Sequence, residues 1–191
     1  MTGKPQRFAT VFNKIVHRKS QYNHLPRMLN MLITEGFLSQ AQEIKAEIVF
    51  NDDLPEVVMH TGVMEIYSKA NKAKEALRVF QRMIYLGISP NAYTYSVLIK
   101  GLSKDPNFLN DAKQYVLEMM DKGMQPNART YTAVFYAFAR LGEDKLNEGK
   151  EFVKQIKARG FVANKKAVRE VLKDKSEPIV ESVIDILFGE Y

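Results

Sequence analysis

The chain has 191 residues, of which 28 are Lys or Arg and 22 are Asp or Glu, so its formal net charge is +6 at pH 7. Hydrophobic residues make up 46% and charged residues 26%, a composition that excludes an intrinsically disordered chain. The absence of cysteine excludes a disulfide scaffold, a thiolate zinc site and a cysteine nucleophile. No apolar run approaches the roughly 18 residues that a membrane-spanning helix needs.

The first predicted element is an amphipathic helix within residues 1–21, where Phe8, Val11, Phe12, Ile15 and Val16 recur at helical spacing. The first 34 residues contain six basic and no acidic side chains, which is also typical of a transit peptide. Serine is nearly absent, however, and the apolar pattern continues into further helices. We therefore favour a packed N-terminal helix, in a mature form without an evident transit peptide if the protein acts in an organelle.

The rest of the chain repeats itself, with glycines spaced 36 and 37 residues apart. The segment GISPNAYTYS at 87–96 is echoed by GMQPNARTYT at 123–132 and more weakly by GFVAN at 160–164. We interpret residues 57–91, 92–127 and 128–164 as three repeats. A degenerate repeat at 22–56 precedes them, and a partial repeat with a capping helix follows at 165–191.

Each repeat is predicted to form two helices joined by a polar turn. In the first repeat, the apolar residues of the two helices are Val58, Val63, Met64 and Tyr67, then Ala76, Leu77, Val79, Phe80 and Met83. Gly87 falls where a helix end needs a residue at positive φ. Asn91 or Thr94 can supply the oxygen that caps the next helix.

The other units vary this pattern. One inserted residue near 105–107 is placed in the inter-helix turn of the second repeat, and two extra residues fall near 142–146 in the third. In the degenerate unit, Pro26 suits a first helical turn, Gly36 ends that helix and a second begins near Ser39. The segment 176–178 caps a last helix that runs through Phe188.

Helix pairs of this size bury their apolar faces only by stacking on one another. The predicted fold is therefore all-α, a right-handed α-solenoid of stacked helix-turn-helix repeats.

The repeats resemble the pentatricopeptide repeat (PPR) family. The resemblance rests on the 35-residue period, the segment YSVLIKGLSK at 95–104, the run Glu75-Ala76-Leu77 with Phe80 and Met83, and the turn at 87–91. It covers residues 57–164 well and 22–56 loosely. The tetratricopeptide repeat has a 34-residue period and a Trp signature, whereas this chain has no Trp and its cleanest unit has 35 residues.

The resemblance implies that the chain binds RNA in mitochondria or chloroplasts, with one base of single-stranded RNA read by each repeat in a groove lined by first helices. The implied base-reading pairs are Thr61 with Asn91, Ser96 with Asn127, and Thr132 with Asn164. In the family such pairs prefer adenine, and an amide offers a base edge both a donor and an acceptor. Alternatively, the asparagines are turn residues and the hydroxyl residues are exposed helix positions.

The resemblance also implies base-stacking by the second residue of each unit, which is Val58, Tyr93 or Arg129. A cation near the end of each first helix is expected to contact phosphate; these are Lys69, Lys104 and Arg140, spaced 35 and 36 residues apart. The alternative is that they offset the helix macrodipole. The degenerate unit, with Pro26 and Glu56 at the reading positions, should read no base, whereas Lys166 and Arg169 could touch phosphate.

The distribution of charge suggests a polyanionic partner, because residues 57–164 hold 16 basic and 10 acidic side chains. Three reading units make tight binding by a monomer doubtful, which points to a homodimer or a larger ribonucleoprotein. One alternative is a structural subunit of an organellar, for example mitochondrial, ribosome that contacts rRNA. Another is a protein–protein adaptor, whose methionine-rich faces include Met28, Met31, Met119 and Met120.

Enzyme chemistry finds no support in the sequence. The HExxH, GxGxxG and Walker A motifs and the nucleophile elbow are absent. The histidines, His17, His24 and His60, are isolated from one another. We therefore expect no catalytic residue, no metal, no cofactor, no small-molecule substrate and no membrane insertion.

Overall fold

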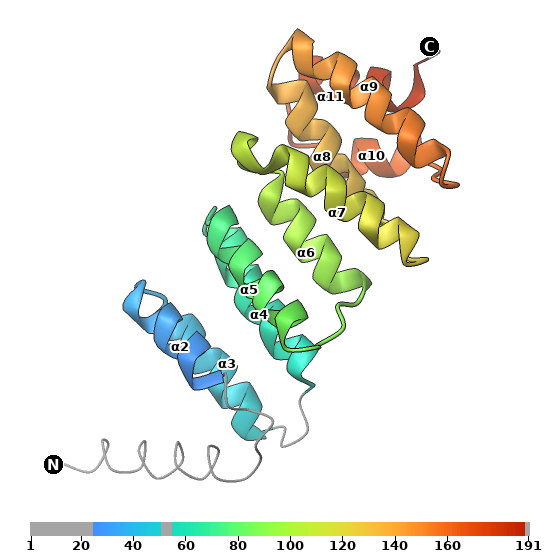
Figure 1. Cartoon of the computed structure of the whole chain (residues 1–191). Helices are drawn as coiled ribbons and strands as arrows, with labels where there is room; N and C mark the ends of the chain where they lie inside the picture. The colour runs from blue at the N-terminus through green and yellow to red at the C-terminus, as the bar shows by residue number, and fades with distance from the viewer. Residues whose placement is uncertain (1–24, 51–54, 190–191) are drawn as a thin grey trace, which may run out of the picture. The chain divides into compact units, whose positions relative to one another are not determined.

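The computed structural model describes residues 25–50 and 55–189, which contain ten α-helices, one short 3₁₀ turn and no β-strand (Figure 1). The N-terminal helix expected within 1–21 lies outside these residues. The chain divides into two compact units, Met1–Val63 and Met64–Tyr191, with the boundary inside α4 (Glu56–Lys69). None of the described helices is long and apolar enough to cross a membrane.

The first unit contains a helical hairpin formed by α2 (Leu25–Thr34) and α3 (Leu38–Phe50). The apolar residues Met28, Leu29 and Leu32 of α2 are buried. Gly36 has a φ of +89° between the helices, where a residue with a Cβ would be strained. The prediction from Pro26 and Gly36 is confirmed, although α3 begins one residue before Ser39.

The second unit is a stack of helix pairs. It contains α5 (Ala73–Tyr85), α6 (Ala92–Leu102), α7 (Leu109–Asp121), α8 (Ala128–Arg140) and α9 (Glu143–Lys157). Helix α6 packs on α5, α7 and α8, and α8 packs in turn on α9 and α10 (Lys165–Val171). Helices α6 and α8 therefore each contact their own second helix and the first helix of the next unit.

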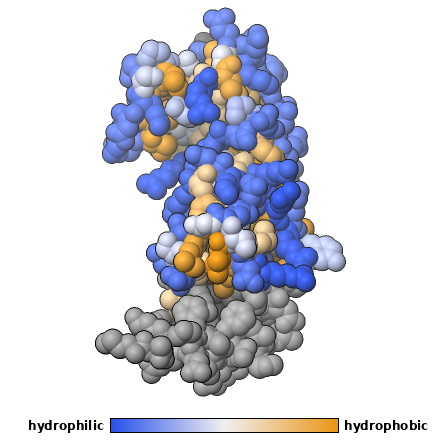
Figure 2. All heavy atoms as spheres, turned by 90° about the vertical axis from the view of Figure 1, so that its left-hand side faces the viewer, coloured by the Kyte–Doolittle hydropathy of each residue, from blue (hydrophilic) through white to orange (hydrophobic). Residues whose placement is uncertain are grey.

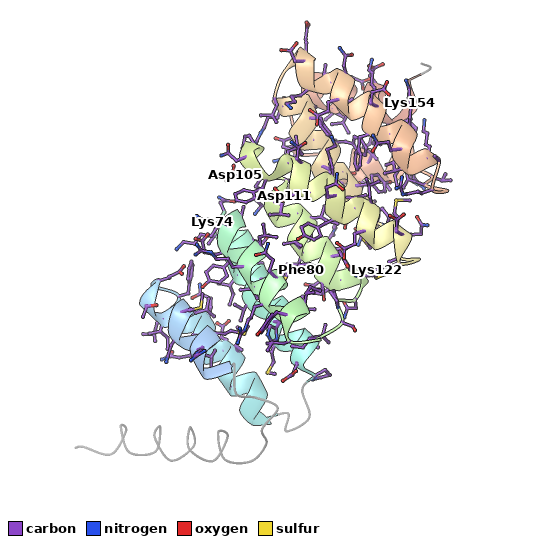
Figure 3. The ribbon with its side chains drawn as sticks, viewed as in Figure 1. Lys74, Phe80, Asp105, Asp111, Lys122 and Lys154 are labelled. Carbon is purple, nitrogen blue, oxygen red and sulfur yellow. The ribbon has the colours of Figure 1, made fainter. Side chains whose placement is uncertain are left out.

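Aromatic side chains fill the contacts between helices of successive repeats. Phe80 of α5, labelled in Figure 3, meets Tyr95 of α6 and Tyr115 of α7 edge to face, with ring centroids 5.5 and 5.0 Å apart. The residues expected inside α5, namely Ala76, Leu77, Val79, Phe80 and Met83, are all buried. Because burial of one large apolar side chain is worth about 1.5–3 kcal/mol, these contacts hold the stack together.

The second helix of each repeat ends at a glycine with positive φ, as predicted. Gly87 has a φ of +74°, and its N–H donates to the carbonyl of Ile84 while that of Ile88 donates to Met83. These are the two hydrogen bonds of a Schellman motif. Gly123 and Gly160 repeat the geometry, with φ of +78° and +80°.

The inserted residues are accommodated in two different ways. In the second repeat the single inserted residue falls at the 3₁₀ turn Pro106–Phe108 between α6 and α7, which confirms the predicted position. In the third repeat the extra residues lengthen the second helix, since α9 has 15 residues and both α5 and α7 have 13.

Helix α11 (Glu177–Phe188) covers the end of the stack by packing on α8 and α9. Its buried face contains Val180, Val183, Ile184, Ile186 and Leu187. Its other face is acidic and exposed, as expected of a terminal cap. The predicted capping by Ser176 is wrong in detail, because Ser176 occupies the N-cap position but its side chain makes no capping hydrogen bond.

Candidate nucleic-acid interface

The candidate interface, called here the first-helix surface, consists of side chains at the starts and ends of α6 and α8. Tyr93, Lys104, Arg129 and Arg140 are exposed, and Lys100 is half-buried. Tyr93 is 55% exposed, and Arg129 is also exposed. In the other unit, Val58 is 45% exposed, so it does not belong to the buried stripe that the sequence suggested. The three predicted stacking residues are thus accessible to a ligand.

Tyr93 is held in place by the preceding first helix. Its hydroxyl donates to Oε2 of Glu65 at 3.0 Å, and Glu65 also forms an ion pair with Lys69 at 2.9 Å. The Lys69 ammonium is the main reason why the pKa of Glu65 is lowered. Partial burial, together with the neighbouring carboxylate, raises the pKa of Tyr93, so the phenol stays protonated and remains a donor.

The three hydroxyl residues predicted to read bases are buried, which contradicts the alternative that they are exposed helix positions. Thr61, Ser96 and Thr132 are only 3%, 2% and 0% exposed. The hydroxyls of Thr61 and Ser96 donate to the carbonyls of Val57 and Ala92, one helical turn earlier, at 2.6 and 2.8 Å. A short hydroxyl side chain readily makes this local bond within a helix, which is why its polar tip turns inward.

Thr132 differs from its two counterparts. Its hydroxyl oxygen is buried and has no hydrogen-bond partner within residues 25–50 and 55–189. A buried hydroxyl without a partner is costly, at about 1–3 kcal/mol. The other two predicted reading hydroxyls, of Thr61 and Ser96, each donate a hydrogen bond to a backbone carbonyl.

The asparagines paired with these residues are helix caps. Oδ1 of Asn91 accepts hydrogen bonds from both the backbone N–H and the hydroxyl of Thr94, at 2.9 and 3.1 Å. Oδ1 of Asn127 accepts from the same two groups of Thr130, both at 3.0 Å. A carbonyl oxygen has two lone pairs, so both acceptor positions of these amides are occupied. The side chains are exposed, but they offer a ligand only the Nδ2 donors.

Asn164 is fixed by a further contact. Its Oδ1 accepts from the backbone N–H of Ala167 at 2.9 Å, and its own backbone N–H donates to the hydroxyl of Tyr131 at 3.1 Å. The first helix of the third repeat therefore holds the last residue of that repeat through Tyr131.

Two of the three cations predicted to bind phosphate, Lys104 and Arg140, form contacts between repeats, whereas Lys69 pairs with Glu65 of its own helix. Nζ of Lys104 donates to the carbonyl of Ser68 at 2.7 Å, and Nη2 of Arg140 donates to the carbonyl of Lys104 at 3.3 Å. Each cation thus meets the C-terminal carbonyls of the preceding first helix, where a positive charge is favourable. These contacts agree with the alternative interpretation, in which the cations offset a helix macrodipole. The helix whose dipole is offset, however, belongs to the neighbouring repeat. Burial, and then the nearby Lys100, lower the pKa of Lys104.

The cations of first and second helices differ in how their charge is balanced. On α7 and α9 and at their ends, ion pairs to carboxylates engage Lys113, Lys122, Lys145, Lys150, Lys154 and Arg159. No ion pair within the described part of the chain engages Lys100, Lys104, Arg129 or Arg140 of the first-helix surface. Positive charge is therefore left over on α6 and α8.

A polar triad that the sequence did not reveal joins the two helices of the second repeat. The hydroxyl of Tyr95 donates to Oε1 of Glu118 at 2.7 Å, and Nζ of Lys122, labelled in Figure 3, donates to that hydroxyl at 2.8 Å. Burial of Glu118 acts to raise its pKa, but the bonds from Lys122 and Tyr95 outweigh this and lower it. The triad fixes α6 against α7 and hence the position of the first-helix surface.

Hydrophilic side chains cover most of the face shown in Figure 2, with apolar residues gathered in smaller groups between them. Within residues 25–50 and 55–189, no cluster of three or more His, Asp or Glu side chains is placed to hold a metal ion. Arg169, which we expected to contact phosphate, instead pairs with Glu181 at 2.6 Å and Glu177 at 3.5 Å.

Comparison with known proteins relates this arrangement to one group of sequences. The model of the PPR repeat family matches residues 55–104. A chloroplastic pentatricopeptide repeat-containing protein of Arabidopsis thaliana is 27% identical over 151 residues, which is 79% of this chain and 16% of the relative. The mitochondrial 15S rRNA processing factor CCM1 of Candida albicans is 28% identical over 120 residues, or 63% of this chain and 14% of that protein. The chain spans less than a fifth of the length of either relative.

Among solved structures, the pentatricopeptide repeat protein PPR10 in complex with an 18-nt psaJ RNA element matches with a TM-score of 0.54 at 17% identity. The match covers 99% of this chain and 33% of that chain. It confirms the predicted α-solenoid fold.

Proposed function

Because the model of the PPR repeat family matches residues 55–104 and the similar proteins include pentatricopeptide repeat proteins, we propose that the chain is a pentatricopeptide repeat protein that binds single-stranded RNA along its first-helix surface, as a non-catalytic protein of mitochondria or chloroplasts. Its relatives include chloroplastic and mitochondrial proteins, and the structure of similar fold contains an RNA element. In this role it supports RNA processing, splicing, stability or translation. Because one fungal relative is an rRNA processing factor, ribosomal RNA is one target class to test.

The observation on which the proposal rests is the unbalanced positive charge of α6 and α8. Lys104 and Arg140 follow one another along the stack at one position of the repeat, and neither has a carboxylate partner in the described part of the chain. A chain of phosphates supplies negative charge at regular intervals and releases counterions when it binds. On α7 and α9, by contrast, carboxylates already neutralise most of the cations.

Bases would lie against Val58, Tyr93 and Arg129, and be read by the pairs Thr61 with Asn91, Ser96 with Asn127, and Thr132 with Asn164. Tyr93 is preoriented by its bond to Glu65, which lowers the entropy cost of stacking. The asparagines would donate from Nδ2, and Ser96 would have to turn its hydroxyl away from Ala92. Thr132 has no hydrogen bond to give up, but its fully buried hydroxyl would have to be exposed before it could reach a base.

Phosphate contact by Lys104 and Arg140 is compatible with their bonds to backbone carbonyls. Both cations have more than one hydrogen to donate, so a phosphate oxygen can be added without loss of the carbonyl. Affinity from only a few repeats is modest, since stacking is worth about 1–3 kcal/mol per base and ordering the RNA offsets part of it. A homodimer or a ribonucleoprotein partner would supply the rest.

Two experiments test the proposal. The purified chain should bind a single-stranded adenine-rich oligonucleotide with a steep salt dependence, and should bind the matching duplex less tightly. In organelle extract, sedimentation before and after RNase distinguishes the roles: a shift to small size after RNase supports RNA-dependent assembly. Co-sedimentation with a ribosomal subunit through high salt would indicate a structural ribosomal protein, and partners that stay bound after RNase would indicate an adaptor.

A further inference from the structure

Lys175 lies in the turn between α10 and α11, outside the three repeats and outside every predicted site. It nevertheless follows Arg140 by 35 residues, which continues the spacing of 35 and 36 that separates Lys69, Lys104 and Arg140. The turn is fixed by a hydrogen bond from the backbone N–H of Lys175 to the carbonyl of Leu172 at 2.9 Å.

The side chain of Lys175 reaches back onto the first helix of the third repeat. Its ammonium lies 5.4 Å from the centre of the Tyr136 ring, and the guanidinium of Arg140 lies 5.9 Å from the same centre. Two like charges therefore share one aromatic ring on α8. Each is attracted by the ring, but their mutual repulsion favours an anion that contacts both.

Nearby carboxylates do not balance this pair. Other cations engage four of the five carboxylates between residues 170 and 185: Glu170 pairs with Lys173, Glu177 and Glu181 with Arg169, and Asp185 with Lys150. The exception, Asp174, adjoins Lys175 in sequence but makes no ion pair within the described residues. Lys175 and Arg140 thus form the end of the unbalanced row of cations.

We propose that Lys175 is a fourth backbone-phosphate contact, in which the terminal cap extends the RNA path by one nucleotide beyond the third repeat. Lys175 and Arg140 both lie close to the ring of Tyr136, which places two cations within reach of one stretch of RNA backbone. This assignment rests on the proposed RNA binding. Lys175 replaces Arg169 as the candidate for phosphate contact beyond the third repeat, because Arg169 pairs with Glu177 and Glu181 of α11.

The test compares Lys175→Met, Lys175→Arg and Lys173→Met in the full chain, using fluorescence anisotropy with a length series of labelled oligoadenylates. Lys173 is the matched control, because it lies in the same segment but pairs with Glu170. Loss of one phosphate contact should lower the slope of log K against log salt by about 0.7 for a single strand. Lys175→Met should show this reduction and lose the affinity gained from the last nucleotide, whereas Lys175→Arg and Lys173→Met should behave like the unmodified chain.

The assignment is overturned if Lys175→Met keeps the slope of the unmodified chain, or if Lys173→Met lowers it equally. Thermal denaturation of each variant establishes that it is folded, and Lys175→Gln, which also removes the charge, takes the place of the methionine variant should that variant be unstable. If the unmodified chain binds no oligonucleotide at any length, the proposed function fails as well. If it binds normally and only the Lys175 effect is missing, this inference alone fails.

Discussion

The ammonium of Lys104 donates to the backbone carbonyl of Ser68, 36 residues earlier, at 2.7 Å. This bond joins the first helices of two successive repeats at their C-terminal ends. Arg140 makes the corresponding bond to Lys104 at 3.3 Å. The side chains that we propose for phosphate binding therefore also help to fix how one repeat is stacked on the next.

Replacing Lys104 by Met should reduce both stability and RNA affinity. Loss of the bond to Ser68 should lower the free energy of unfolding by about 1 kcal/mol, measured by urea denaturation. If Lys104 also binds phosphate, the salt slope of RNA binding should fall by about 0.7. Lys100→Met is the control for stability, since within residues 25–50 and 55–189 no hydrogen bond joins Lys100 to the neighbouring repeat. An unchanged unfolding curve for Lys104→Met would contradict the structural role.

The double change Asn91→Asp with Asn127→Asp tests base reading without disturbing the caps. Asp caps a helix about as well as Asn, so the bonds from Thr94 and Thr130 should persist and thermal stability should change little. Only the Nδ2 donors are replaced by acceptors. Base preference, measured with homopolymeric oligonucleotides, should therefore move away from adenine. An unaltered preference in a stable variant would refute the assignment of these asparagines.

Glycine substitutions of opposite effect test the geometry of the repeat ends. Gly123→Ala should destabilise the chain by about 1–2 kcal/mol, because its φ of +78° is unfavourable for a residue with a Cβ. No atom lies within 4 Å of the added Cβ, so the penalty is conformational. Gly62→Ala, inside α4 and equally uncrowded, should instead stabilise by up to about 1 kcal/mol. Differential scanning calorimetry measures both, and a stabilising Gly123→Ala would contradict the turn.

The stability of the fold should decrease at acidic pH, partly because the carboxylate of Glu148 becomes protonated. Hydrogen bonds from Lys113 and then Lys145 lower its pKa below the ordinary value of 4.5. The stabilisation is therefore complete above about pH 4.5 and is lost as the pH falls through the lower, folded-state pKa. Glu148→Gln should cost ~1 kcal/mol at neutral pH and should flatten the acid side of the stability profile.

The control for this profile is Glu151→Gln. Glu151 pairs with Lys154 on the surface of the same helix and is 66% exposed, so its removal should have little effect. Equal profiles for the two variants would show that the link between α7 and α9 adds nothing to stability.

The sequence by itself was sufficient for the helix pairs and their ends. The spacing of Ala76, Leu77, Phe80 and Met83 identified the buried face of α5, and Gly87 identified the turn that follows. These features depend on local backbone preference and on the period of apolar residues, which short stretches of sequence encode. The stacking of the pairs followed because no single pair can bury its own apolar face.

The chemistry of the candidate site was decided by tertiary structure. Sequence indicated Ser96 and Thr132 as reading residues but not their burial, and it identified Asn91 without showing that Thr94 occupies both lone pairs of its amide oxygen. The sequence identified Lys104 by its position in the repeat. It did not show that Lys104 donates to the carbonyl of Ser68, which lies in another repeat. The contact of Lys175 with Tyr136 depends likewise on how the last helices fold back. Side-chain partners far apart in the chain are set by packing, and packing is determined by all helices together rather than by any one period of the sequence.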